Sequence, residues 1–256
     1  TRRSRVGTGA GNAPSALLKP GSNHDDGMVY LESVRTLRNS ILLSNLDRRP
    51  KTILITSAGA GEGKTMTAVH LAMSHAGQNR KTLLIDCDFR RPSVQKYILH
   101  DGMNTSVGLS KVLSEGTPWA DALVKLEDPS DLHVLPAGAS GTRHPADLLG
   151  ERFDAILAEA TALYDLVIID SPPILGFAES IQLAANVNAV VLVSVAGKTK
   201  RKAIRSVLER LRRVRAPILG MILNKTSRDG SDSGHQYYYG YYTDKSNPPA
   251  VRYTKD

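Results

Sequence analysis

Apolar residues along this chain fall into two patterns. Short continuous apolar runs predict buried strands at 51–56, 82–86, 132–135, 165–169, 189–195 and 218–223. Apolar residues that recur every three or four positions predict helices at 30–43, 63–76, 107–114, 119–124, 152–163, 178–185 and 199–214. Because apolar strands alternate with amphipathic helices, we predict an α/β fold with a mostly parallel sheet and helices on both of its faces.

The two ends of the chain lack these patterns. Residues 1–27 are rich in Gly, Ser, Asn and Pro and predict a flexible leader, whereas 28–225 predict one folded domain. Residues 226–256 predict a flexible tail, which contains six tyrosines but no aliphatic period. No apolar run approaches the roughly 18 residues of a membrane-spanning helix. The basic N-terminus has no apolar stretch behind it, so we expect no secretory signal.

A glycine-rich turn lies between the strand at 51–56 and the helix at 63–76. It follows the pattern G-x-x-x-x-G-K-[ST], except that Ala58 replaces the first glycine. In such a loop, backbone N–H groups bind phosphates, Lys64 neutralises phosphate oxygens and the Thr65 hydroxyl binds Mg²⁺. We expect the side chain of Glu62 to lie in solvent. The predicted nucleotide-binding residues are Gly59, Ala60, Gly61, Glu62, Gly63, Lys64, Thr65 and Met66.

Three aspartates follow predicted strands. Asp86 and Asp88 come at the end of the strand at 82–86, and Asp170 follows the strand at 165–169. Because the carboxyl ends of parallel strands meet at one edge of a sheet, we expect these carboxylates to converge. One or two of them can then act on Mg²⁺ while another accepts a proton. Arg90 and Arg91 have two open interpretations, as partners of phosphate or as partners of acidic residues.

Charge and cysteine content narrow the possible partners. The net charge is +8, and nine Lys or Arg residues lie in 198–215 with Glu209 as the one acid, which suggests an acidic partner or an anionic surface. An apolar stripe of the same helix, formed by Ile204, Val207, Leu208 and Leu211, should face the core. We expect no nucleic-acid partner, because no recognition motif accompanies the charge. With Cys87 as the single cysteine, the chain has no internal disulfide and fits a reducing cytosol.

Together, these segments resemble the catalytic domain of a bacterial tyrosine kinase of the P-loop family. Residues 58–65 match its Walker A motif, 83–90 its D-x-D-x-R Walker A′ motif and 167–172 its Walker B motif, and the resemblance covers most of 30–242. It implies a P-loop NTPase fold of the partition and nitrogenase-iron-protein type. It also implies an ATP- and Mg²⁺-dependent protein-tyrosine kinase that regulates capsular or exopolysaccharide synthesis and export.

The resemblance assigns roles to residues of the site. It implies that Asp86 is the base toward the tyrosine hydroxyl, that Asp88 and Asp170 handle Mg²⁺, and that Asn224 contacts the adenine. The implied catalytic set is Lys64, Asp86, Asp88 and Asp170. The implied metal ligands are Thr65, Asp86, Asp88 and Asp170, with Mg²⁺ bound together with ATP or ADP.

The resemblance also implies an assembly. Glu32, Arg35 and Arg38 match an E-x-x-R-x-x-R signature of ring-like oligomers, although their spacing also fits a solvated salt-bridge face. The implied sites of autophosphorylation, by a neighbouring protomer, are Tyr237, Tyr238, Tyr239, Tyr241, Tyr242 and Tyr253. Further implied partners are a transmembrane polysaccharide co-polymerase or modulator and a cognate protein-tyrosine phosphatase. The protein would then work in the cytoplasm, at the inner face of the membrane, through that modulator, which is either separate or an N-terminal part of the same chain.

Two rival functions share parts of this pattern. A partition or positioning ATPase has the same fold, but it usually carries a signature lysine at the position of Gly59 and lacks a tyrosine-rich tail. A non-catalytic, nucleotide-dependent scaffold of a polysaccharide exporter would not require Lys64, Thr65 and three aspartates. We therefore expect the kinase.

Overall fold

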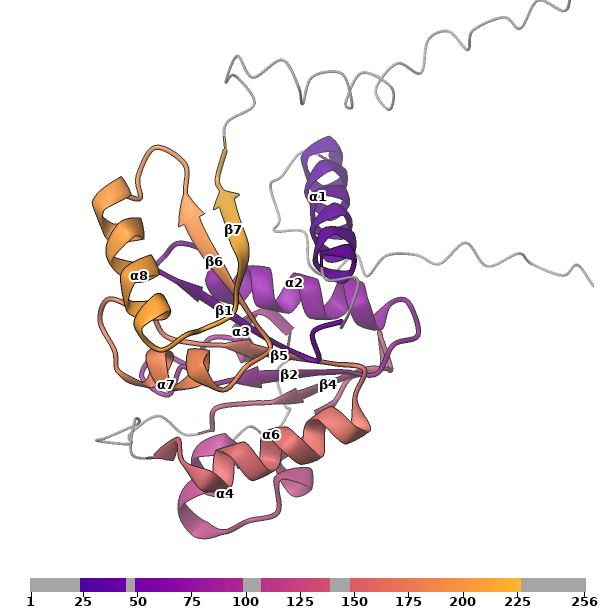
Figure 1. Ribbon diagram of the computed structural model, residues 1–256. Coiled ribbons are helices and arrows are strands. Elements are labelled where there is room, and N and C mark those ends of the chain that lie inside the picture. The colour runs from indigo at the N-terminus through magenta and orange to yellow at the C-terminus, as the bar shows by residue number, and fades with distance from the viewer. Residues whose placement is uncertain (1–23, 45–48, 99–106, 139–147, 227–256) are drawn as a thin grey trace, which may run out of the picture. The chain divides into compact units, whose positions relative to one another are not determined.

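The computed structural model describes residues 24–44, 49–98, 107–138 and 148–226. Its centre is a seven-stranded sheet with the order β3-β4-β2-β5-β1-β6-β7 (Figure 1). The strands are β1 (Thr52–Ser57), β2 (Thr82–Asp86), β3 (Val124–Lys125), β4 (Leu132–Leu135), β5 (Leu166–Asp170), β6 (Ala189–Val195) and β7 (Ile218–Asn224). Neighbouring strands run parallel except for β3, which is antiparallel to β4. The predicted fold class is confirmed.

Most of the helices lie where the periodicity predicts them. They are α1 (His24–Leu43), α2 (Lys64–Ala76), α3 (Gln95–Ile98), α4 (Leu109–Glu115), the 3-10 helix η2 (Trp119–Ala122), α6 (Glu151–Leu163), α7 (Glu179–Ala185) and α8 (Arg201–Arg213). The helix predicted at 119–124 extends two residues too far, because η2 ends at Ala122 and Val124 already belongs to β3. α1 begins at His24, inside the predicted leader 1–27.

Both faces of the sheet are covered. Leu83 and Ile85 of β2 belong to a core cluster that also contains residues of α4, α6, α7 and α8. Leu84, between them, belongs to the other cluster, which contains residues of α1 and α2. This alternation follows from the two-residue period of a strand, and it explains why these strands are apolar throughout. In Figure 1, α2 lies on one side of the sheet and α4 and α6 lie on the other.

The topology brings three strand ends together. β5 lies between β2 and β1, so the carboxyl ends of these three strands share one edge of the sheet. Asp86, the last residue of β2, lies directly opposite Asp170, the last residue of β5. β1 continues through residues 58–63 into α2. The loop and two of the three predicted aspartates are thereby placed side by side.

Two further observations concern the chain as a whole. By its internal contacts the chain divides into Thr1–Asn224 and Lys225–Asp256, and nearly all of the second unit lies outside the described residues. The boundaries predicted for the leader, domain and tail therefore stay predictions. Within the described residues, no helix combines the length and the apolar character that crossing a membrane requires.

Candidate active site

The glycine-rich loop adopts the backbone that its glycines permit. Gly61 and Gly63 have positive φ angles of 76° and 98°, whereas the φ angle of Ala58 is not positive. Ala58 therefore replaces the first glycine of the motif without backbone strain. Gly63 caps the N-terminus of α2, and a Cβ atom there would collide with the side-chain amide of Asn224. The loop thus needs glycine at its end more than at its start.

Glu62 lies inside the loop and not in solvent, so our expectation for its side chain was wrong. Its Oε2 atom accepts hydrogen bonds from the N–H groups of Ala58, at 2.9 Å, and Gly59, at 3.1 Å. Its Oε1 atom accepts a hydrogen bond of 2.6 Å from the Thr199 hydroxyl. Buried backbone donors need acceptors, and in this tight turn a carboxylate supplies them. The side chain is buried as a result.

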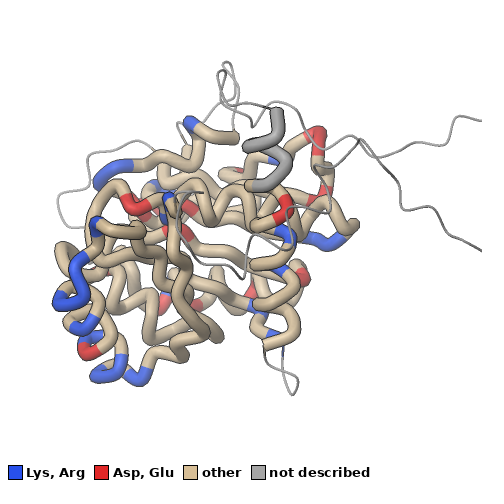
Figure 2. The backbone as a smooth tube through the Cα atoms, turned by 90° about the horizontal axis from the view of Figure 1, so that it is seen from above, with Lys and Arg blue, Asp and Glu red and all other residues tan. Residues whose placement is uncertain are grey.

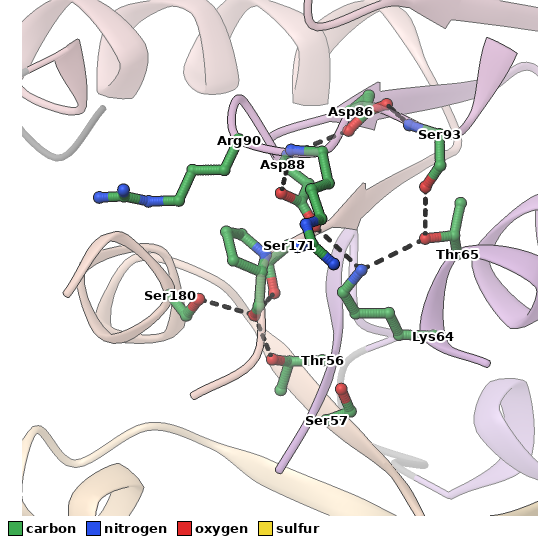
Figure 3. A network of polar contacts seen from close by, with 12 residues as sticks. Thr56, Ser57, Lys64, Thr65, Asp86, Asp88, Arg90, Ser93, Ser171 and Ser180 are labelled. Atoms are coloured by element: carbon green, nitrogen blue, oxygen red, sulfur yellow. Dashed lines mark hydrogen bonds and ion pairs between the residues drawn. The ribbon is translucent and has the colours of Figure 1, made fainter. Parts of the chain in front are cut away.

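Lys64 and Thr65 begin α2 and point toward the strand ends (Figure 3). The Lys64 ammonium lies 3.0 Å from Asp88 Oδ2, and the Thr65 hydroxyl lies 3.2 Å from the hydroxyl of Ser93. Burial lowers the pKa of Lys64, but the carboxylates of Asp170 and Asp88 outweigh it, so that the pKa is raised overall. The ammonium is therefore charged at neutral pH and available to phosphate.

Asp86 supports the segment that follows β2. Its Oδ1 atom accepts the N–H of Asp88 at 3.0 Å, and its Oδ2 atom accepts those of Ser93, at 3.1 Å, and Val94, at 3.2 Å. Burial raises the pKa of Asp86 to about 6, although these hydrogen bonds act against the increase. A carboxylate has about four acceptor sites, so one remains for a proton. The role of Asp86 as base stays a prediction.

Asp170 is the least compensated group of the site. Both carboxylate oxygens are buried, and neither accepts a hydrogen bond of full geometry in the described part of the chain, although the nearby Thr65 hydroxyl acts to lower the pKa of this group. Burial raises the pKa of Asp170 to about 8, while the charge of Lys64 lowers it. Orphaned, buried carboxylate oxygens fit a site that receives a cation or ordered water.

The site suits Mg²⁺ that arrives with a nucleotide. No three His, Cys, Asp or Glu side chains among the described residues are grouped as a ready metal site, so the expected convergence of three carboxylates is not a preformed cage. Asp88 is paired with Lys64, and Asp86 with backbone amides. Mg²⁺ needs few protein ligands and keeps waters, so Asp170 and Thr65 would hold it with phosphate oxygens. When bound, the ion would neutralise charge on the phosphates.

Arg90 has a structural partner. Its Nε atom lies 2.8 Å from Oε1 of the buried Glu179, and its guanidinium carbon lies 4.7 Å from the centroid of the Phe177 ring. In Figure 3, the side chain of Arg90 extends away from Lys64. Of the two interpretations left open, the ion pair is the one seen for Arg90. For Arg91, the backbone N–H donates to Asp88 Oδ1 at 3.0 Å.

Sequence reasoning missed several supporting residues. Thr56 and Ser180 both donate to the carbonyl of Pro172, at 3.0 and 2.7 Å, which fixes the turn after β5 (Figure 3). Ser93 and Thr199 contact Thr65 and Glu62, respectively. No motif marks these residues, because each meets its partner only through the fold.

Asn224 ends β7 beside the phosphate loop. Its side-chain amide donates to the carbonyl oxygen of Glu62 at 3.0 Å. The structure therefore brings it to the predicted nucleotide site and gives it a contact with the loop itself. Its predicted contact with adenine stays a prediction.

The three residues predicted for assembly divide into two groups. Arg35 pairs with Glu32 at 3.1 Å, and the two side chains are 55% and 60% exposed. Arg38 instead contacts α2, donating from Nη1 to the carbonyl of Ser74 at 2.7 Å. The exposed pair can meet a neighbour, whereas Arg38 fastens α1 to its own domain. The six predicted tyrosines lie outside the described residues.

The basic residues of α8 and its flanks face outward. Lys and Arg gather along the side of the molecule in Figure 2 where α8 lies in Figure 1. Val207 and Leu211 of the predicted apolar stripe are buried and Ile204 packs against the same core, whereas Leu208 is only half-buried and lies outside this cluster. The exposed basic residues are Lys198, Lys200, Arg201, Lys202, Arg205, Arg210, Arg212, Arg213 and Arg215.

Comparison with known proteins identifies the family. Residues 50–220 match the model of the AAA domain family. The chain is 38% identical over 218 residues to the tyrosine-protein kinase YwqD of Bacillus subtilis, covering 84% of this chain and 87% of that protein. This chain belongs to the bacterial tyrosine kinases. The predicted family is confirmed. The partition and positioning ATPases share the fold of this kinase, but that likeness does not assign the chain to their family.

Solved structures agree with this assignment. The kinase domain of the Escherichia coli tyrosine kinase ETK superimposes on this kinase with a TM-score of 0.70 at 26% identity, covering 77% of each chain. The septum site-determining protein MinD of Pyrococcus horikoshii, solved with Mg-ADP, gives a TM-score of 0.60 at 23% identity, over 70% of this chain and 72% of that one. The likeness to MinD shows the shared fold alone.

Proposed function

We propose that this kinase transfers the γ-phosphoryl group of Mg·ATP to tyrosines 237–253 of a neighbouring copy. The observation that carries the proposal is the orphaned carboxylate of Asp170 beside the charged Lys64, at the end of a phosphate loop. That arrangement suits a triphosphate and its cation. The phenol oxygen forms a bond to the γ-phosphorus, the bond from that phosphorus to the β-phosphate oxygen breaks, and ADP leaves.

The residues of the site divide this work. Lys64 exchanges its contact with Asp88, which is 3.0 Å long, for phosphate oxygens. Asp86 accepts the phenolic proton, since a carboxyl group with a pKa of about 6 is mostly ionised at neutral pH. Asn224, whose side chain already contacts the phosphate loop, contacts the adenine. The tail supplies the acceptor, because a segment without competing structure can place a phenol in line with the phosphate.

A mixing experiment tests both the acceptor and the direction of transfer. A Lys64→Met chain with an intact tail is combined with a chain in which all six tail tyrosines are Phe, and labelled ATP is added. Transfer between copies predicts label on the tail of the Lys64→Met chain. Lys125→Met replaces an exposed lysine of β3 and serves as the control for the loss of one positive charge in Lys64→Met. Label on serine, or on tyrosines outside 237–253, would contradict the acceptor, and label appearing only in unmixed parent chains would contradict transfer between copies.

Assembly follows from the same proposal. The exposed Glu32–Arg35 pair would bind a neighbouring copy in a ring-like oligomer. Arg35→Ala isolates this contact, because Arg38 is engaged within its own chain. Light scattering should give smaller particles for Arg35→Ala than for the parent, with the exposed Arg80→Ala as control. An unchanged particle size would leave the pair as a solvated salt bridge.

The cellular role is proposed from the family resemblance. The kinase would regulate capsular or exopolysaccharide synthesis and export, at the inner face of the membrane. It would act through a transmembrane modulator, and a cognate protein-tyrosine phosphatase would reverse its action. Deleting the gene and restoring it as Lys64→Met separates catalysis from presence: polysaccharide output should follow the parent and not the variant. Equal output from both would favour a non-catalytic scaffold.

A further inference from the structure

We infer that Glu62 is a positioning residue for the nucleotide, which fastens the phosphate loop to the segment that leads into α8 through Thr199. The inference rests on the nucleotide site of the proposed function but not on transfer to tyrosine. Three features carry it: the hydrogen bonds at the beginning of the loop, the contact with Thr199, and the closure of this network through the end of β7.

The first feature is the engagement of the loop by its own side chain. Glu62 Oε2 accepts the N–H groups of Ala58 and Gly59, at 2.9 and 3.1 Å. The carboxylate therefore bridges the start of the loop to the residue just before Gly63. These are charge-assisted bonds of a buried group, which are stronger than neutral ones. They set the curvature of the loop without any ligand.

The second feature joins the loop to a distant segment. Oε1 of the same carboxylate accepts a hydrogen bond of 2.6 Å from the Thr199 hydroxyl. The hydroxyl oxygen of Thr199 in turn accepts the N–H of Val195 at 2.8 Å. Thr199 also donates its own N–H to the Val195 carbonyl at 3.0 Å. Gly197, with a φ angle of 68°, allows the turn between them. Thr199 is thus held from both sides, and it is a firm anchor for Glu62.

The third feature closes the network. The N–H of Ala196, beside Val195, donates to the carbonyl of Asn224 at 2.9 Å. The side chain of Asn224 returns to the carbonyl of Glu62 at 3.0 Å. The loop is therefore connected to the ends of both β6 and β7. A shift of the segment that leads into α8 would move the loop with it.

This network has a consequence for binding. Ordering a loop when a ligand binds costs free energy and lowers affinity. A loop that already has its bound shape avoids this cost, so the nucleotide binds more tightly. Removing the carboxylate should weaken binding of nucleotide, raising KM while kcat at saturating ATP changes little. The opposite sign follows if Glu62 acts only as a negative charge, because its removal would then strengthen the binding of an anionic nucleotide. The two explanations differ in direction, not only in size.

ADP binding with Mg²⁺, measured by calorimetry on the full chain, tests the inference without requiring kinase activity. Glu62→Ala should bind ADP about tenfold more weakly, because the loop must then be ordered when the nucleotide binds. Glu62→Gln, which keeps one acceptor oxygen, should fall between the parent and Glu62→Ala. Thr199→Val should weaken binding about threefold to tenfold, and Thr199→Ser, which keeps the hydroxyl, should restore it. Thr161→Val removes an exposed hydroxyl that bonds within α6 and is the control.

Three outcomes would overturn the inference. ADP binding by Glu62→Ala that equals or exceeds parental affinity would assign Glu62 a charge effect or no effect. Thr199→Val with parental affinity, or Thr199→Ser as weak as Thr199→Val, would remove the link to α8. Thermal melting of each variant tests folding, and the Thr199 pair keeps the test open if Glu62→Ala does not fold. A parent that binds ADP but labels no tyrosine would contradict the proposed function alone.

Discussion

Replacing Asp170 by Asn should stabilise the nucleotide-free protein at high pH. Asp170 has a pKa of about 8 in the folded chain, against an ordinary value of 3.8. The folded state therefore holds this proton more tightly than the unfolded state does. The stability that the proton contributes is complete below pH 3.8 and is lost as the pH rises through 8. Asn cannot ionise, so the variant lacks this loss.

The size of the effect follows from the two pKa values. Between pH 5 and pH 8, a shift from 3.8 to about 8 lowers the free energy of unfolding by on the order of 3 to 4 kcal/mol. Because the neutral acid and the amide have similar shapes, the two chains should have comparable stability at pH 5. At pH 8 the variant should be more stable by a few kcal/mol. The charge of Asp86 is one of the causes that raise the pKa of Asp170, so the comparison measures the two neighbouring acids together.

Urea unfolding followed by circular dichroism, with EDTA and without nucleotide, measures this difference at pH 5, 6, 7 and 8. Asp121→Asn, at an exposed position, controls for the loss of one negative charge. A difference between parent and Asp170→Asn that does not grow with pH would refute the reasoning. So would a variant less stable than the parent at pH 8. Addition of Mg·ADP should reverse the order, because the variant loses the proposed cation ligand.

Three further predictions concern α2, its contact with α1 and its capping glycine. Burial lowers the pKa of His75 to about 4, so the stability it contributes above its ordinary value of 6.5 is lost as the pH falls through 4. Urea unfolding measures how much the free energy of unfolding falls between pH 7 and pH 4.5. In His75→Gln this fall should be smaller than in the parent by roughly 1–2 kcal/mol, allowing for solvent screening. Arg38→Ala removes the 2.7 Å contact with the Ser74 carbonyl and should lower stability by about 1 kcal/mol in the same assay; an unchanged midpoint would contradict the fastening of α1. Gly63→Ala, at a φ angle of 98°, should abolish ADP binding in calorimetry, and parental affinity would contradict the crowding described there.

Much of the fold could be predicted because the strands are buried on both faces. β2, β4 and β6 begin and end at the predicted residues, since a polar or turn-forming residue lies within two positions of each end. Short elements with few residues to establish a period were less predictable. α3 was missed, and the segment near Trp119 was extended too far, into β3. Periodicity needs several turns before it separates a helix from an irregular segment.

The candidate site divides along a similar line. Its motif residues, such as Lys64 and Asp170, could be located because loop and strand ends are local features. The placement of Glu62 could not, because a charged residue in a glycine-rich turn gives no local sign of burial. Its partner Thr199 lies 137 positions away. The pairing of Arg90 with Glu179 across 89 positions was open for the same reason. Side-chain partners of this kind are set by the tertiary fold.

The position of Asp86 and Asp170 at the centre of the sheet has a consequence for motion. These aspartates are the last residues of β2 and β5. Each of these strands is paired on both sides and has no exposed side chain. Amide hydrogens of such strands exchange with solvent only when the whole domain opens. The loop around Gly61 and Gly63 is not held by strand pairing and should exchange much faster. The slowest-exchanging part of the protein would therefore carry the proposed base and the proposed cation ligand, and a change in activity would have to come from the faster segments around them.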